Sequence, residues 1–179
     1  MDGQLRQKRR VIVRKWGEAA LAVFPPGAAD FLRKVKDPFA NPAGTTIFSE
    51  VEFLFDALLN DLSREEIAPR VARIIQLSCV QDVAPARAVS FVFELKEILR
   101  AELREALRDA DGVERFHELE QRIDRLAVMA FESYVEHRQR LADIRVREVR
   151  NQVASVLRMT TLRPEDPSSC TPSRGGCRQ

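Results

Sequence analysis

The two histidines are the side chains from which metal or haem chemistry would have to start. His117 and His137 lie twenty residues apart in one predicted helix, which separates them by about 30 Å, too far to ligate one metal ion. Glu114 and His117 form a Glu-x-x-His pair of the kind found in di-iron proteins, but the sequence holds no second pair. Neither histidine has the apolar surround that haem requires. We expect no metal and no cofactor.

The cysteines and the phosphate-binding motifs give no sign of catalysis either. Cys79 follows an apolar helical run and is expected to be a small buried hydrophobe. Cys170 and Cys177 belong to segment 159–179, rich in Pro, Ser, Gly and Arg and expected to be disordered. Two thiols without further ligands make a poor zinc site, and no P-loop is present. The sequence predicts that the protein is not an enzyme.

The length and the net charge of the chain limit the classes of protein to which it can belong. The 179 residues suffice for one compact domain, and 29 basic against 27 acidic residues leave a net charge of +2. The basic cluster between Arg6 and Lys15 is therefore expected to be a solvated helix face, not a nucleic-acid site. We find no export signal and no membrane span. We expect a cytoplasmic protein.

Apolar residues recur at helical spacing along nearly the whole chain, which predicts an all-α fold. We expect a single helical bundle of about six helices over residues 1–158, for which a globin-like arrangement is one possible form. Its last helix, the exit helix, is expected to run from about 112 to 158.

Several helix ends carry local signals. Ser49 is expected to cap the third helix. Ser63 and Glu66 have the spacing of a capping box for the fourth, and Pro85 suits the first turn of the fifth. Pro69 is expected to leave only a single turn at 64–67 or to kink the helix, because proline removes a hydrogen bond from a helix interior.

The exit helix changes character along its length. Up to Tyr134 it is apolar enough to be core, whereas the following segment keeps a narrow apolar stripe flanked by arginines. This stripe is expected to consist of Leu141, Ile144, Val149, Val153 and Val156. A narrow stripe fits a two-stranded coiled coil, with a solvated surface helix as the alternative. We expect a homodimer formed through this helix.

The segment KDPFANPAGTT interrupts the helices. Asp37 and Asn41 each precede a proline, Pro38 and Pro42, so both are expected to be extended and to close turns with their side chains. Phe39 is expected to be the apolar anchor that pins this structural clasp to the bundle. The functional alternative is that the loop is a sensing or docking surface.

Four phenylalanines suggest a different function. Phe53, Phe55, Phe91 and Phe93 could line a pocket between the third, fourth and fifth helices. The rival hypothesis is therefore a sensor of a small ligand or a haem-like cofactor.

Three separated blocks resemble one family. They are KDPFANPAG, VQDVAPARAVSFVFELKEILR and RIDRLAVMAFESYVEHRQRLADIRVREV. Together they resemble the RsbRD-type N-terminal domain, named for the RsbT co-antagonist proteins of the bacterial stressosome. The likeness covers roughly residues 9–150 and includes the leading Trp16 helix and the FPP break.

The resemblance implies a helical input module. In full-length co-antagonists such a domain precedes a STAS domain, dimerises and passes a signal along its exit helix to the part that captures the RsbT kinase. We expect no STAS domain after Arg150, because the remaining chain is too short. The implied role is a non-catalytic signalling module whose partner is a kinase, a STAS-domain protein or a redox complex, the last as an accessory subunit.

Overall fold

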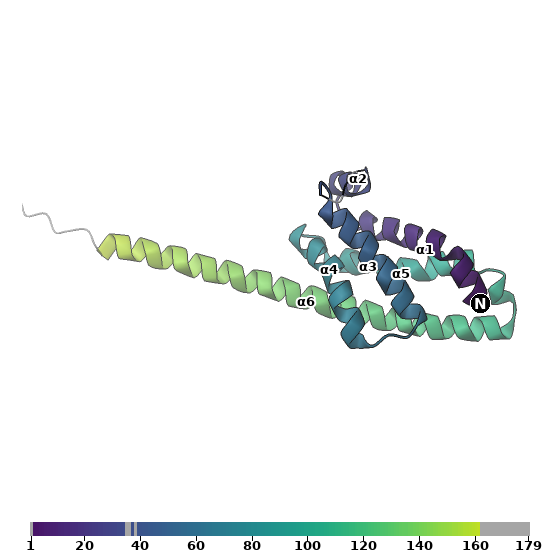
Figure 1. Cartoon of the computed structure of the whole chain (residues 1–179). Helices are drawn as coiled ribbons and strands as arrows, with labels where there is room; N and C mark the ends of the chain where they lie inside the picture. Colours follow the sequence, from purple (N-terminus) through teal and green to yellow (C-terminus); the bar gives the residue numbers. More distant parts are fainter. Residues whose placement is uncertain (1, 35–36, 38, 162–179) are drawn as a thin grey trace, which may run out of the picture. The chain divides into compact units, whose positions relative to one another are not determined.

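The computed structural model describes residues 2–34, 37 and 39–161, and side chains as far as Ser155. This part of the chain is all-helical, as the sequence predicts, and contains no strand. Its elements, in order, are α1 (Asp2–Ala22), α2 (Pro26–Lys34), α3 (Pro42–Leu59), α4 (Arg64–Val80), α5 (Pro85–Glu102), a 3-10 turn (Ala106–Arg108) and α6 (Ala110–Thr161) (Figure 1). None of the described helices is long and apolar enough to cross a membrane.

The chain divides into two compact units, one ending at Gln139 and the other beginning at Arg140. The first unit holds the bundle. In it α1 packs against α5 and α3, and α3 packs against α4. Trp16 is fully buried and stacks on Phe91 with ring centroids 6.1 Å apart. Its indole N–H donates to the Phe91 carbonyl at 2.8 Å, so the polar edge of the largest core side chain is satisfied.

The first part of α6 completes this core. Ile123, Leu126 and Ala130 are fully buried. The hydroxyl of Tyr134 donates to the carbonyl of Val83 at 2.8 Å and ties α6 to the loop before α5. This half of α6 is therefore a structural part of the bundle.

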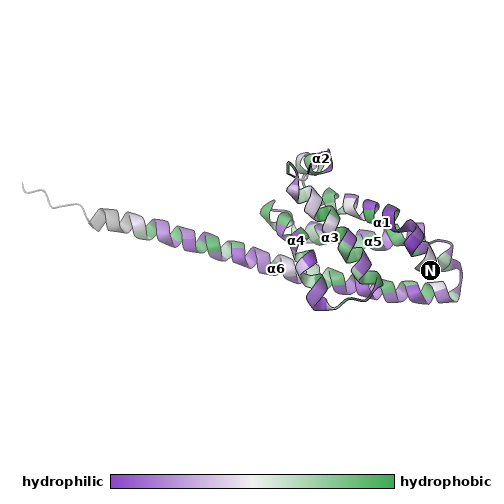
Figure 2. Ribbon diagram, in the orientation of Figure 1, coloured by the Kyte–Doolittle hydropathy of each residue, from purple (hydrophilic) through white to green (hydrophobic). Residues whose placement is uncertain are grey.

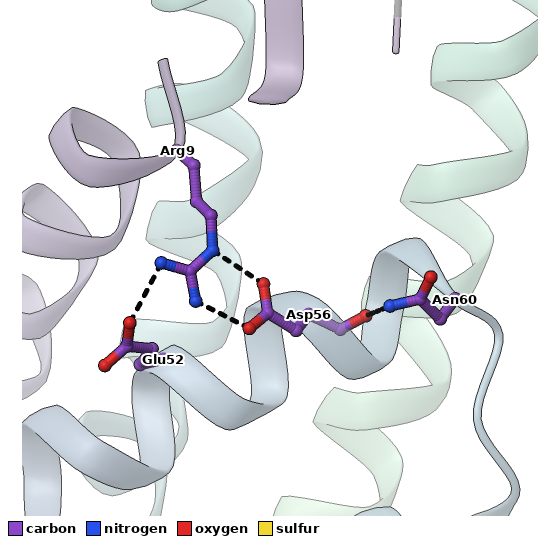
Figure 3. A network of polar contacts seen from close by, with 4 residues as sticks. All are labelled: Arg9, Glu52, Asp56 and Asn60. Atoms are coloured by element: carbon purple, nitrogen blue, oxygen red, sulfur yellow. Dashed lines mark hydrogen bonds and ion pairs between the residues drawn. The ribbon is translucent and has the colours of Figure 1, made fainter. Parts of the chain in front are cut away.

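An ion-pair network joins α1 to α3 (Figure 3). The Arg9 guanidinium donates to both carboxylate oxygens of Asp56, at 2.8 and 2.6 Å, and to Glu52 at 2.9 Å. These acceptors raise the pKa of Arg9 above its usual value. Asn60 donates to the Asp56 carbonyl at 2.8 Å, near the end of α3. A bidentate pair of this kind fixes the orientation of both side chains.

A buried carboxylate joins α3 to α4. The Glu50 side chain is 3% exposed and pairs with Arg73 at 2.6 Å and Arg70 at 3.4 Å. The Arg70 guanidinium also lies 4.4 Å from the centroid of the Phe53 ring. Burying an unpaired carboxylate is costly, so these two arginines are what allows Glu50 to face the core.

The local signals for α4 and α5 are largely confirmed. The Ser63 amide donates to the Glu66 carboxylate at 3.1 Å, as a capping box requires, and α5 begins at Pro85. The single turn at 64–67 is wrong, because α4 continues through Pro69. The missing hydrogen bond is offset by the burial of Ile67 and Val71 on either side of the proline.

The start of α3 differs from the prediction. Ser49 lies inside the helix, and Asn41 is the N-cap. The Asn41 side chain accepts from the Gly44 amide at 2.9 Å and donates to the Leu32 carbonyl in α2 at 2.8 Å. A Cβ at Gly44 would lie 2.8 Å from that carbonyl, so α2 approaches too closely for a side chain there. Asn41 is thus the residue that clasps α2 to α3.

The predicted anchoring role of Phe39 is wrong. Its side chain is 98% exposed. The predicted turn at Asp37 is present, since its carboxylate accepts from the Phe39 amide at 3.0 Å. Pro38 lies outside the described residues, and Pro42 occupies the first turn of α3. Polar bonds of Asp37 and Asn41 close this loop without an apolar anchor.

Replacing Asn41 with alanine tests this clasp. We expect Asn41→Ala to lower the free energy of unfolding by about 1–2 kcal/mol, because it removes a helix cap and leaves the Leu32 carbonyl without this donor. Phe39→Ala is the matched control and should change it by less than about 0.5 kcal/mol. Urea unfolding followed by circular dichroism measures both, and a larger loss for Phe39→Ala would contradict the assignment.

Candidate interaction surface

Within the first unit, α6 is apolar on two faces. Its outer face carries Val128, Phe131 and Val135, which are 55%, 53% and 51% exposed. They follow one another at steps of three and four residues and therefore share one side of the helix. Val128 and Val135 lie roughly 120–160° around the helix from the buried Ile123 and Ala130, whereas Phe131 lies about 80–100° from them, at the edge of the buried face.

A surface groove of about 680 Å³ lies beside this outer face, between α5 and α6. We call it the α5–α6 groove; it is lined by Pro85, Ala86, Val89, Phe93, Asp124, Ala127, Val128 and Phe131. Phe93 projects from α5 and is half-exposed. The carboxylate of Asp124 is paired with Lys96 at 2.7 Å. The groove thus offers mainly carbon, and its acidic group already has a partner in the bundle.

The second unit carries a separate apolar stripe on α6. Val146, Val149 and Val153 follow one another at steps of three and four residues, and each is more than half exposed. We call these three residues the valine stripe. The hydropathy colouring shows apolar and polar residues interleaved along this stretch (Figure 2). Arg145 and Arg150 are exposed beside the stripe, so it has the narrow apolar seam with charged flanks that is typical of paired helices.

The residues predicted for the dimer helix divide between two faces. Val149 and Val153 belong to the valine stripe, whereas Ile144 lies roughly 140–180° around the helix from them, with Leu141 nearer to Ile144. The face of Ile144 continues with Glu148, Asn151 and Ser155, which are polar and exposed. The side chain of Val156 lies outside the described residues. The single predicted seam therefore mixes two faces.

Sequence reasoning also missed Val128, Phe131, Val135 and Val146. The signal was present, because Val128, Val135, Ala142 and Val149 recur every seven residues. It was hidden by a second apolar pattern in the same helix, which belongs to the core.

The four predicted pocket residues lie in different surroundings. Phe55 and Phe91 are buried in the core, Phe53 lies under the Arg70 guanidinium, and Phe93 lines the α5–α6 groove. They are not brought together around a shared cavity. This packing therefore does not support a sensor pocket lined by these four residues.

A smaller cavity of about 220 Å³ lies between α3, α4 and α6 and is rimmed by Arg64, Arg122 and Arg125. Arg122 donates to the Leu58 carbonyl at 2.8 Å and lies 3.3 Å from the Asp61 carboxylate. Arg64 pairs with a carboxylate of α6, and Arg125 lies 3.8 Å from Asp61. These arginines bridge the helices that surround the cavity.

The histidines and cysteine are not assembled into a site. His117 is exposed and hydrogen-bonds Gln121 at 3.1 Å. Cys79 is buried, as predicted, and burial raises the pKa of its thiol. Among the described residues there is no group of three or more His, Cys, Asp or Glu side chains that could hold a metal ion.

Three of the six basic residues of α1 pair with acids of other helices. Lys15 donates to the Glu102 carboxylate at 2.6 Å, and Lys8 donates to the Glu102 carbonyl at 2.6 Å and lies 3.3 Å from its carboxylate. The Lys15 and Lys8 ammonium groups hold the pKa of Glu102 below its usual value, although partial burial opposes this. Together with Arg9, these residues fasten α1 to α5 and α3.

Comparison with protein families identifies the chain. The model of the RsbT co-antagonist protein rsbRD N-terminal domain matches residues 10–162. The chain belongs to this family. Curated proteins and solved structures give no significant match.

Membership in the RsbRD N-terminal family supports a stressosome-type signalling input domain, which is a regulatory class of protein and not a known catalytic one. The matched region ends at residue 162 and so includes the whole of α6. The exposed apolar residues of α6 thus lie inside the family domain, not in an appendage to it.

The ion pair at Glu102 gives a pH-dependent prediction. Its contribution to stability is present above the pKa of the unfolded chain and is lost as pH falls through the lower folded-state pKa. We expect Glu102→Gln to cost about 1 kcal/mol at neutral pH, with the difference from the wild type shrinking in acid. Urea unfolding at a series of pH values measures this. Glu94→Gln on the same helix is the control, and a Glu102→Gln cost that is constant into acid would contradict the assignment.

Proposed function

We propose that this protein is a dimeric, cytoplasmic signalling input domain that acts through protein contact and not through catalysis. The observation that carries the proposal is the valine stripe, three exposed valines at coiled-coil spacing on α6. Family membership supports the same role, because the family is named for co-antagonists of RsbT.

The physical reason for dimerisation is the cost of leaving this stripe in water. Each valine is about half exposed, so burying the exposed part gains roughly 1 kcal/mol per side chain. Six such side chains in a dimer give on the order of 6 kcal/mol, against an association cost of at least about 4 kcal/mol. The stripe alone therefore supports only a weak dimer.

The output that we propose follows from the position of the stripe on the last helix of the family domain. A change in how two copies pair along α6 would alter the surface that a partner protein contacts on this helix. The partner class is a kinase of the RsbT type or a STAS-domain protein, with a redox complex as the alternative. In each case the contact is between proteins and requires no cofactor.

Replacing one valine of the stripe with glutamate tests the dimer. We expect Val149→Glu to raise the dimer dissociation constant about tenfold or more, because it places charge in the apolar seam. Ile144→Glu is the matched control: Ile144 is as exposed as Val149 but lies on the other side of the helix, so its replacement should leave dimerisation unchanged. Sedimentation equilibrium of the full chain measures both.

Two results would overturn the proposal. One is a wild-type protein that stays monomeric at high micromolar concentration. The other is a dimer that Ile144→Glu disrupts while Val149→Glu does not.

A further inference from the structure

We infer that the arginine-rimmed cavity between α3, α4 and α6 binds a small organic anion, a monocarboxylate with a short apolar body. The cavity is the one of about 220 Å³ whose rim is formed by Arg64, Arg122 and Arg125. Every residue that lines it belongs to the first unit, so binding there does not depend on the proposed dimer.

The interior of the cavity is lined by carbon. Leu58 of α3, Ile67 of α4 and Met129 of α6 all line it, and all three are buried. An apolar pocket with a few polar groups at defined positions is the usual construction of a small-molecule site. Liquid water occupies about 30 Å³ per molecule, so the volume corresponds to roughly seven non-hydrogen atoms. Pockets for drug-sized ligands are larger, at roughly 300–1,000 Å³, so this cavity fits a compact ligand.

The rim carries more positive than negative charge. Arg64 pairs with Glu132. Arg122 and Arg125 share the carboxylate of Asp61. Three guanidinium groups thus face two carboxylates, which leaves one positive charge uncompensated at the mouth of an apolar cavity. A ligand with an anionic head and an apolar body matches this arrangement, because its head pairs with the rim while its body contacts the carbon-lined interior.

The two arginines that share Asp61 have donors available for such a head. They approach the same oxygen, Oδ1 of Asp61, at 3.3 Å for Arg122 and 3.8 Å for Arg125. Both distances exceed the roughly 2.7–2.9 Å of a charge-assisted hydrogen bond. Arg122 also donates to the Leu58 carbonyl at 2.8 Å, which fixes its orientation. Arg125 is exposed, and its contact with Asp61 is its shortest ion pair within the described residues. Since an arginine fork can bind a carboxylate through two parallel hydrogen bonds, Arg125 receives the head of the ligand.

The spacing along α6 brings the rim and the interior together. Arg122 and Arg125 lie three residues apart, and Met129 follows Arg125 by four. Residues at these spacings share one face of a helix. A carboxylate bound at the two arginines can therefore place its body against Met129, one turn along the helix.

Asp61 competes with the ligand for these arginines. It follows the end of α3 with a φ of 52°, a conformation that Asp and Asn adopt more readily than other residues with a side chain. Its carboxylate is largely exposed, so it can turn into solvent when another carboxylate takes its place. In an input domain this exchange would alter how α6 is tied to the end of α3, a consequence that rests on the proposed function.

Methyl NMR of the full chain tests the site, with hexanoate as the probe. The chain has three methionines, so labelling of the methionine methyl carbons gives a simple spectrum, in which Met129→Leu identifies the Met129 signal. We expect hexanoate to shift this signal saturably, with a dissociation constant of about 1 mM or lower. Acetate, which lacks the apolar body, and 1-hexanol, which lacks the charge, should each bind at least about tenfold more weakly.

Two substitutions at the rim should change the affinity in opposite directions. We expect Arg125→Gln to weaken hexanoate binding about tenfold or more, because it removes the charged donor. Asp61→Asn should strengthen binding about threefold or more, because asparagine also tolerates the left-handed backbone but does not compete as an anion. Arg115→Gln is the matched control: Arg115 is also an exposed arginine of α6, but it pairs within its own helix and does not line the cavity. Its replacement should leave the affinity unchanged, and circular dichroism checks that all three variants are folded.

Three results would overturn the inference. One is a Met129 signal that hexanoate leaves unshifted up to about 10 mM. Another is 1-hexanol binding as tightly as hexanoate with no effect of Arg125→Gln, which would make the cavity a site for neutral apolar molecules. The third is an Arg115→Gln effect as large as that of Arg125→Gln, which would mean that hexanoate responds to the surface charge and not to the cavity. None of these results affects the proposed dimer, which sedimentation measures separately.

Discussion

The structure depends on one constraint, which is that α6 carries apolar side chains on two different faces within the bundle. One face is satisfied, because Ile123 and Leu126 are buried against the other helices. The second face, with Val128 and Phe131, is only about half covered within the described chain. A helix of this kind couples two functions, since any shift that repacks its inner face also moves its outer face. For an input domain this coupling is useful, because the same rigid element can receive a change in the bundle and present it to a partner.

Polar bonds add to apolar burial in fixing which face of α6 points inward. The hydroxyl of Tyr134 donates to the Val83 carbonyl, and Arg122 donates to the Leu58 carbonyl at the end of α3. Both acceptors lie in loops or helix ends, where carbonyls lack helical partners. Bonds at these positions resist rotation of α6 about its own axis more effectively than apolar contacts, which are not directional. These bonds therefore help to hold α6 in the orientation that leaves Phe131 half exposed.

The fold was largely predictable because its signals are local, while the errors occurred where two local patterns compete. Ser63 with Glu66, and Pro85, act within one helical turn and behave as predicted. Ser49 was predicted to cap α3, but Asn41 does so, and its amide also donates to the Leu32 carbonyl of α2. The predicted seam of α6 likewise combined residues from two faces of the helix. Periodicity detects apolar residues on a helix, but it does not say which of two apolar faces the bundle covers.

The ion pairs between helices could not be predicted at all, since nothing in the sequence indicates which charged residues pair. Arg9 and Asp56 are 47 positions apart, yet they form the bidentate pair that joins α1 to α3. Lys8 and Lys15 likewise meet Glu102, far along the chain in α5. A basic first helix could have been a nucleic-acid surface, but three of its six basic residues are paired with acids of other helices. Such pairs are half-exposed and individually weak, so their main effect is to fix the packing of α1. The surface left for contact on α5 and α6 is then distinguished by its apolar side chains, which favours a protein partner.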